Sequence, residues 1–176
     1  MLKRVRPVRG FTLIELVIAM AIAALLTMLA LPMLTNWIAD NQIQVGAESI
    51  SSGLRAAMAA AVNRNENVEF VLDPTTGTGG WSVWTVADRA TTIQAGVFTE
   101  GAPRDVFTVT PAGATTVTFN GIAQIVNPNA DGTVPLTRVR VTIPSVAGSR
   151  PLEVWIAGQR IKMCDPAFVA PDPKGC

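Results

Sequence analysis

The 176-residue chain has 49% hydrophobic residues, two cysteines, no histidine and a formal net charge of +1. This length accommodates one globular domain plus an anchoring segment. The chain lacks histidine, a nucleophile motif, a phosphate-binding loop and a cluster of metal ligands. We therefore expect no enzyme, no cofactor and no metal site.

The first ten residues form a basic leader that ends at Gly10 and contains no acid. Its cations are Lys3, Arg4, Arg6 and Arg9. An ordinary secretory signal is cleaved after its apolar stretch, whereas here the distinctive residues stand at the boundary between the basic and apolar segments. We therefore expect the apolar stretch to be retained. Cleavage near Ala30, which would release a soluble periplasmic protein, is the alternative that we rank lower.

An apolar stretch follows from Phe11 to Leu31, and Glu15 is its one charged residue. As a helix, these roughly 21 residues span the ~30 Å hydrocarbon core of a bilayer, with the basic leader on the cytoplasmic side. An ionised carboxylate in hydrocarbon costs at least ~2.5–3.5 kcal/mol. We therefore expect Glu15 to contact a cation.

The segment Gly10-Phe11-Thr12-Leu13-Ile14-Glu15 resembles the processing site of type IV prepilins and type II secretion pseudopilins. The resemblance implies that a prepilin peptidase cleaves between Gly10 and Phe11 and N-methylates Phe11. It also implies that the amine of Phe11, in the same subunit or a neighbouring one, is the cation that meets Glu15 during assembly.

Pro32 divides the expected helix into two halves. A proline removes one intrahelical hydrogen bond, which predicts a kink or local melting, and the resembling family has a proline at the corresponding place. Residues 32–63 form the second, amphipathic half because apolar residues recur there at spacings of three and four. This stripe comprises Ile43, Ala47, Ile50, Leu54, Ala57, Met58 and Ala61. The polar triplet at 63–65 predicts the end of the helix.

Residues 64–176 are predicted to form a globular, β-rich head. Apolar or alternating segments bounded by turn residues indicate about seven short strands. They are drawn from residues 68–72, 81–87, 106–109, 115–119, 122–126, 137–143, 152–156 and 160–163. Asn120-Gly121 predicts a type I′ hairpin turn before 122–126, and the polar span 88–103 carries no strand signal. The fold class is thus α+β, one long N-terminal helix packed on an antiparallel sheet domain.

Three tryptophans of the head, Trp81, Trp84 and Trp155, are able to stack on nucleic-acid bases, but packing in the core is the simpler interpretation. Trp81 and Trp84 cannot share one strand face, because their spacing is odd. One of these two is therefore expected to be exposed or at a subunit interface.

Charge is distributed unevenly along the chain. Without the leader the chain has 10 basic and 13 acidic residues, a net charge of −3, which does not indicate a general nucleic-acid binder. Residues 11–137 carry −6 and residues 138–176 carry +3. The last part is thus either a polyanion-binding face or scattered, solvated charge.

In an exported protein, Cys164 and Cys176 predict one disulfide.

The segment Gln159-Arg160-Ile161-Lys162-Met163-Cys164-Asp165-Pro166 resembles the FimT/FimU (GspH-like) branch of minor pilins, which often shows Gly-Arg-x-Arg ahead of Cys-Asp-Pro. Lys162 replaces the second arginine, and the glycine lies one residue earlier, at Gly158. The resemblance implies a non-specific site for double-stranded DNA at Arg160 and Lys162. Further candidate contacts are Arg138, Arg140 and Arg150.

Together these features predict a minor type IV pilin. The chain would begin as a single-pass protein of the inner membrane and then move into the pilus fibre or its tip, reaching the periplasm and cell surface. Its partners would be other minor and major pilins. Three roles stay open: priming of pilus assembly, capture of DNA for natural transformation, and service as a pseudopilin of type II secretion.

Overall fold

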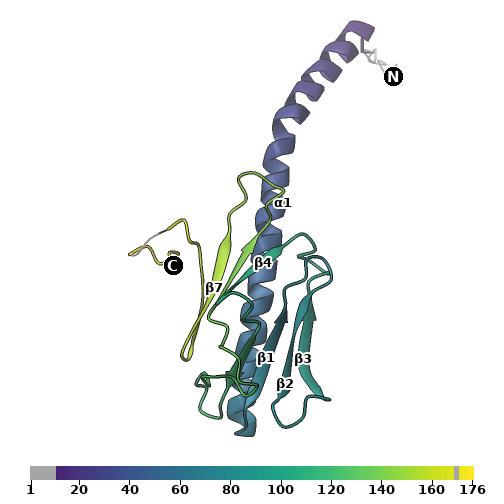
Figure 1. Cartoon of the computed structure of the whole chain (residues 1–176). Coiled ribbons are helices and arrows are strands. Elements are labelled where there is room, and N and C mark those ends of the chain that lie inside the picture. The colour runs from purple at the N-terminus through teal and green to yellow at the C-terminus, as the bar shows by residue number, and fades with distance from the viewer. Residues whose placement is uncertain (1–10, 169–170) are drawn as a thin grey trace, which may run out of the picture. The chain divides into compact units, whose positions relative to one another are not determined.

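The computed structural model describes residues 11–168 and 171–176, so the leader with Gly10 lies outside the described residues. The chain divides into two units, the first ending at Thr35 and the second comprising Asn36–Cys176. Helix α1, Leu13–Arg64, contributes to both units (Figure 1). The second unit, here called the head, holds all eight strands that the described residues form.

Helix α1 begins at a cap formed by Thr12. The backbone N–H of Glu15 donates to Thr12 Oγ1 over 3.3 Å, the bond expected when threonine precedes a first turn with glutamate at its third position. The apolar side chains at residues 11–30 and 33–35 are exposed in the single chain, and an 18-residue window of α1 has a mean hydropathy of 2.5. By length and composition α1 is able to cross a membrane.

Pro32 lies inside α1, which runs through it without interruption. The predicted local melting of the helix is therefore not found in the single chain. At its other end α1 stops at Arg64, as the polar triplet predicted. Asn65 has a positive φ of 52°, its N–H donates to Val62 O, and the N–H of Glu66 donates to Ala61 O. This pair of bonds is a Schellman motif, which satisfies the last helical carbonyls.

The predicted apolar stripe of α1 is buried in the head. Six of its members are fully inaccessible to solvent, namely Ile43, Ala47, Ile50, Leu54, Ala57 and Ala61, and Met58 is partly buried against them. The stripe belongs to one hydrophobic core that also includes the inward side chains of both sheets. Burial of this stripe is what holds the amphipathic half of α1 to the strands.

The strands form two antiparallel sheets of four. The first has the order β3-β2-β1-β5 and the second has the order β4-β6-β7-β8. Strands of the first sheet are β1 Val68–Asp73, β2 Gly80–Thr85, β3 Thr92–Val97 and β5 Thr116–Phe119. Strands of the second sheet are β4 Val106–Thr110, β6 Arg138–Thr142, β7 Leu152–Ala157 and β8 Arg160–Cys164. The α+β prediction is confirmed.

Two details of the head differ from the sequence predictions. Strand β3 lies within residues 88–103, the span for which no strand was predicted. It is a mostly exposed edge strand that pairs only with β2, so its sequence lacks the apolar alternation of a half-buried strand. The prediction of a type I′ turn at Asn120-Gly121 is wrong. Neither residue has a positive φ; instead Asn120 Oδ1 accepts from the N–H groups of Ile122 and Gln124. Residues 122–126 consequently form only an isolated bridge.

Candidate functional site

The first candidate site is the start of α1. Glu15 stands in the first helical turn, where its negative charge is favourable near the positive end of the helix dipole. Its side chain is exposed, and the part of the chain that the structure describes gives its carboxylate no ion pair. Phe11, two residues ahead of the helix, is also exposed. Both groups are therefore accessible to a neighbouring subunit.

The second candidate site is the outer face of strands β6, β7 and β8. The register pairs Arg138 with Trp155 and Trp155 with Lys162, so these three side chains form one row across the sheet. Arg140 pairs with Glu153 in the next row, and Arg160 pairs with Ala157 in the row on the other side. We call this surface the basic face; its members are Arg138, Arg140, Glu153, Trp155, Arg160 and Lys162. It carries four cations and one acid.

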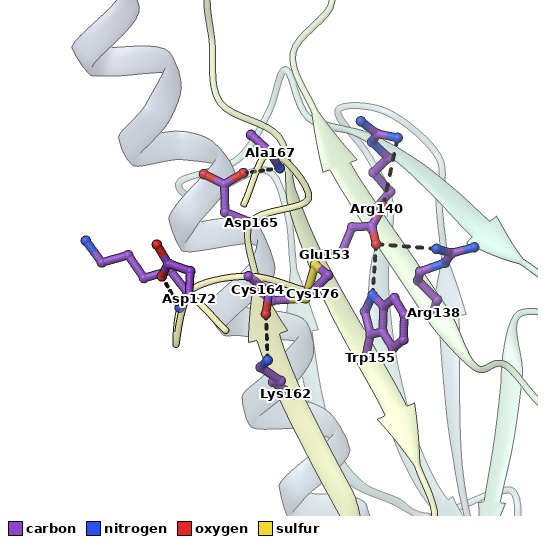
Figure 2. The surroundings of a disulfide bond; sticks show 12 residues. Arg138, Arg140, Glu153, Trp155, Lys162, Cys164, Asp165, Ala167, Asp172 and Cys176 are labelled. Carbon is purple, nitrogen blue, oxygen red and sulfur yellow. Dashed lines mark hydrogen bonds and ion pairs between the residues drawn. A yellow bond between two sulfur atoms is a disulfide. The ribbon is translucent and has the colours of Figure 1, made fainter. Parts of the chain in front are cut away.

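Glu153 lies in the row beside Trp155, with its side chain almost fully buried. Its Oε2 is 3.5 Å from Arg138 Nη1 and its Oε1 is 3.8 Å from Arg140 Nη1. Trp155 Nε1 donates to the same carboxylate over 2.8 Å, as Figure 2 shows. One carboxylate is thus shared by two arginines, which leaves an excess of positive charge on this face.

Trp155 is fixed in orientation by two contacts. The indole N–H is bonded to Glu153, and the guanidinium carbon of Arg138 lies 5.3 Å from the ring centroid, a cation–π distance. The residue is still 37% exposed. Sequence reasoning did not assign Glu153 to this site; the alternation of residues 152–155 places it on the same strand face as Trp155, but only the register reveals the arginines opposite.

A two-residue turn at Gly158-Gln159 joins β7 to β8. Gly158 has a φ of 59° and is the first residue of the turn, the position that a type II′ hairpin reserves for glycine. Gln159 Nε2 donates to Ile122 O over 2.9 Å. The glycine of the C-terminal motif is therefore at position 158 because the first residue of this turn needs a positive φ. The turn sets the register that brings Arg160 and Lys162 onto the basic face.

The predicted disulfide between Cys164 and Cys176 is present. Beside it the N–H of Asp165 donates to Lys174 O, and Lys162 Nζ donates to Gly175 O over 2.6 Å. The last residues of the chain are thereby held against the end of β8 (Figure 2). Lys162 keeps two further N–H donors for other partners.

Arg150 lies apart from the basic face. Its backbone N–H donates to Asp40 Oδ1 of α1 over 2.8 Å. Together with Asp40 it lines a separate cavity of about 400 Å³ next to the disulfide-linked residues. The structure thus places four of the five predicted cations on the basic face, whereas the fifth, Arg150, lies beside Asp40.

Two more carboxylates are buried in the head. Glu69 on β1 pairs with Arg89 over 2.6 Å and accepts a hydrogen bond from Trp84 Nε1. Asp105 is fully buried against Gly46 of α1, and neither of its oxygens has a hydrogen-bond partner among the residues that the structure describes. Burial raises the pKa of Asp105 to about 7, although Arg104 opposes the shift. Among residues 11–168 and 171–176 no His, Cys, Asp and Glu side chains cluster as a metal site would require.

Comparison with known proteins agrees with this arrangement. Residues 5–31 match the prokaryotic N-terminal methylation motif, and residues 46–158 match the family described as type II transport protein GspH. The type IV narrow pilus major component PilA5 of Thermus thermophilus is 29% identical over 111 residues, which cover 61% of this chain and 90% of that protein.

Two crystal structures of the Pseudomonas aeruginosa type IV minor pilin FimU share the fold. Their TM-scores are 0.51 and 0.50, at 19% and 18% sequence identity. The matches cover 73% and 71% of this chain and 92% and 94% of the FimU chains. At this level of identity the likeness establishes the arrangement of helix and sheets.

Proposed function

The chain belongs to the GspH family of type II transport proteins, and from this premise we propose that it is a minor pilin that primes type IV pilus assembly. Membership in a pilin family makes the chain a non-catalytic subunit. The N-terminal methylation motif implies processing by prepilin peptidase, residence in the membrane and then assembly with other pilins. Incorporation into a filament, which priming requires, is supported by the accessible carboxylate of Glu15.

Glu15 supports the proposal because an isolated acid on an apolar helix needs a partner in an apolar environment. When α1 packs among the helices of other subunits, the carboxylate loses its hydration. The N-methylated amine of Phe11 of a neighbouring subunit supplies the opposite charge. Removing one member of a buried ion pair costs about 3–5 kcal/mol, which is enough to prevent the insertion of a subunit.

The test uses pili sheared from cells that carry Glu15→Ala in place of the native chain. We expect the variant to be absent from the sheared fraction, whereas Glu48→Ala, which removes an exposed acid from the same helix, remains. Immunoblots of membrane and pilus fractions measure both. Glu15→Ala at the native level in sheared pili contradicts the proposal.

Deletion of the whole protein should lower the number of pili per cell and leave exoprotein secretion unchanged. The reverse result indicates a secretion pseudopilin.

We propose as a second function that the basic face binds DNA. The supporting observation is that four cations share one sheet face with a single acid, Glu153, although the mature chain as a whole is acidic. The contacts would be made to phosphates, so binding would be independent of sequence. With about four phosphate contacts, log K should fall with log salt with a slope of about −3 to −4.

Fluorescence anisotropy with a labelled 20-base-pair duplex at low salt tests this function. We expect Arg160→Ala/Lys162→Ala to lose most of the affinity and to lower the salt slope by about 2. Arg55→Ala/Arg64→Ala, which removes two exposed arginines from α1, is the matched control and should bind as the native chain does. Absence of binding by the native chain at low salt rules the function out.

A further inference from the structure

A cavity of about 320 Å³ opens beside the row of Arg138 and Trp155. It is lined by Thr110, Thr137, Arg138, Trp155, Ile156 and Ala157, so it lies where the ends of β4, β6 and β7 meet. Its walls combine an aromatic ring, a guanidinium and threonine side chains, which is the mixture that takes a flat, polar aromatic ligand.

Trp155 differs from the other tryptophans of the chain in its setting. Trp81 is 6% exposed, stacks on Phe70 and donates to Ser49, so it is a core residue. Trp84 is half-buried and donates to the buried carboxylate of Glu69. Trp37 is exposed, but it lies on α1, away from the cations of the sheet. Trp155 alone, among these four described residues, joins an accessible ring to a cavity and to a cationic row.

The cations are placed to bind phosphates on either side of a ligand at Trp155. Arg138 and Lys162 flank the ring across the two neighbouring strands, and adjacent strands are about 4.8 Å apart. Arg160 stands one row further along β8 and forms no ion pair within the described ranges. A base stacked near the indole would therefore have its own backbone charges met by donors on both sides.

We infer that the cavity at Trp155 is a base-stacking site, so that the basic face binds single-stranded DNA in preference to duplex DNA. The inference rests on the proposed DNA-binding function and names the form of DNA that this face takes. In a duplex every base is paired and stacked between its neighbours, and it cannot offer a free π-face to the indole. An unpaired nucleotide turns its base outward, and stacking on an aromatic side chain is tolerant of sequence.

The indole is suited to this task because its orientation is set before the ligand arrives. Its N–H is held by Glu153, and Arg138 covers part of the ring, so little side-chain entropy is lost on binding. Arg138 also offers a planar guanidinium on which a base stacks. Trp155 is on the outer face because its neighbours Val154 and Ile156 point into the core.

The test compares two ligands on the mature chain, residues 11–176, in detergent micelles at low salt. Labelled oligo(dT) of 20 nucleotides and a 20-base-pair duplex are titrated by fluorescence anisotropy. We expect the native chain to bind the single strand more tightly than the duplex. Trp155→Ala should weaken single-strand binding about tenfold and duplex binding by clearly less, and Trp155→Phe should retain most of the affinity.

Two further variants keep the test decisive if Trp155→Ala folds poorly. Ala157→Leu fills the cavity while keeping the indole in the chain and should weaken single-strand binding more than duplex binding. Arg160→Ala removes a phosphate contact and should weaken both ligands alike. Equal losses for both ligands, or no loss, in Trp155→Ala and Ala157→Leu overturn the stacking site while leaving DNA binding in place. Failure of the native chain to bind either ligand overturns the DNA-binding function itself, and the stacking site with it.

Discussion

The outer faces of the two sheets carry the same three kinds of side chain in different proportions. On the first sheet Glu69 accepts from Trp84 and pairs with one arginine, Arg89. On the second sheet Glu153 accepts from Trp155 and faces two arginines, with Lys162 and Arg160 close by. The first set has one cation for one acid, whereas the second has a surplus of positive charge and a ring that is 37% exposed.

This difference separates a structural arrangement from one that is able to bind. At Glu69 one close cation and one indole donor both meet Oε2, so the carboxylate charge is matched by a single arginine and no surplus of positive charge remains. A carboxylate shared at 3.5 and 3.8 Å orients two arginines and neutralises only one charge. The variants below remove the carboxylate of Glu69, neutralise the unpaired buried carboxylate of Asp105, or enlarge the surplus of positive charge around Glu153.

The largest effect is expected from Glu69→Ala. Its side chain is completely buried, and the change leaves Trp84 without an acceptor and Arg89 without a counter-ion. Because Arg89 is 51% exposed and rehydrates, we expect the free energy of unfolding to fall by about 2–4 kcal/mol. Urea unfolding followed by circular dichroism measures it. A loss below about 0.5 kcal/mol would show that the first sheet does not depend on this set.

A smaller change is expected from Asp105→Asn, which tests burial without pairing. The pKa of Asp105 is raised from 3.8 to about 7 in the folded state, so the folded state retains a proton that the unfolded chain loses. Stability from this group therefore falls as pH rises from about 4 to 7. The amide of the variant cannot ionise, so the variant should be more stable than the native chain by about 1–3 kcal/mol at pH 8.

The pH profile of that difference is the control. The gain from Asp105→Asn should vanish near pH 4, where the folded carboxyl group is neutral like the amide, and reach its full size above pH 7. Thermal unfolding of both proteins across this range provides the measurement. An equal gain at pH 4 and pH 8 would mean that the carboxyl charge is not its cause.

The smallest effect on stability is expected from Glu153→Gln. The amide keeps an acceptor for Trp155, and Arg138 and Arg140 are exposed enough to hydrate, so the free energy of unfolding should change by less than about 1 kcal/mol. Affinity for DNA should rise about three- to tenfold at low salt because one negative charge leaves the basic face. Glu66→Gln, an exposed acid beyond this face, should change neither; an unchanged affinity in Glu153→Gln argues against binding at this face.

Local signals in the sequence predicted a large part of the fold. The spacing of the apolar stripe on α1 reflects the helical repeat, and the polar triplet ending at Asn65 gave the helix end because asparagine tolerates a positive φ. Alternation predicted that Arg138 and Arg140 share an outward face. These features depend only on residues close to one another in the chain.

Features that depend on distant residues could not be predicted. Strand β3 exists because β2 pairs with it, and Gly96 allows the ring of Trp81 to lie close to its backbone. Gly121 approaches Asn65 too closely for a side chain, so the Asn-Gly pair serves that contact rather than a hairpin. The meeting of Glu153 with two arginines required the register between β6 and β7, which no local pattern encodes.

The link between Cys164 and Cys176 bears on when the basic face is completed. Gly175, whose carbonyl receives the ammonium of Lys162, is held in place by the adjacent half-cystine. Thiols stay reduced in the cytoplasm and are oxidised after export. If the head is exported as the pilin role implies, Lys162 would acquire its fixed position only outside the cytoplasm.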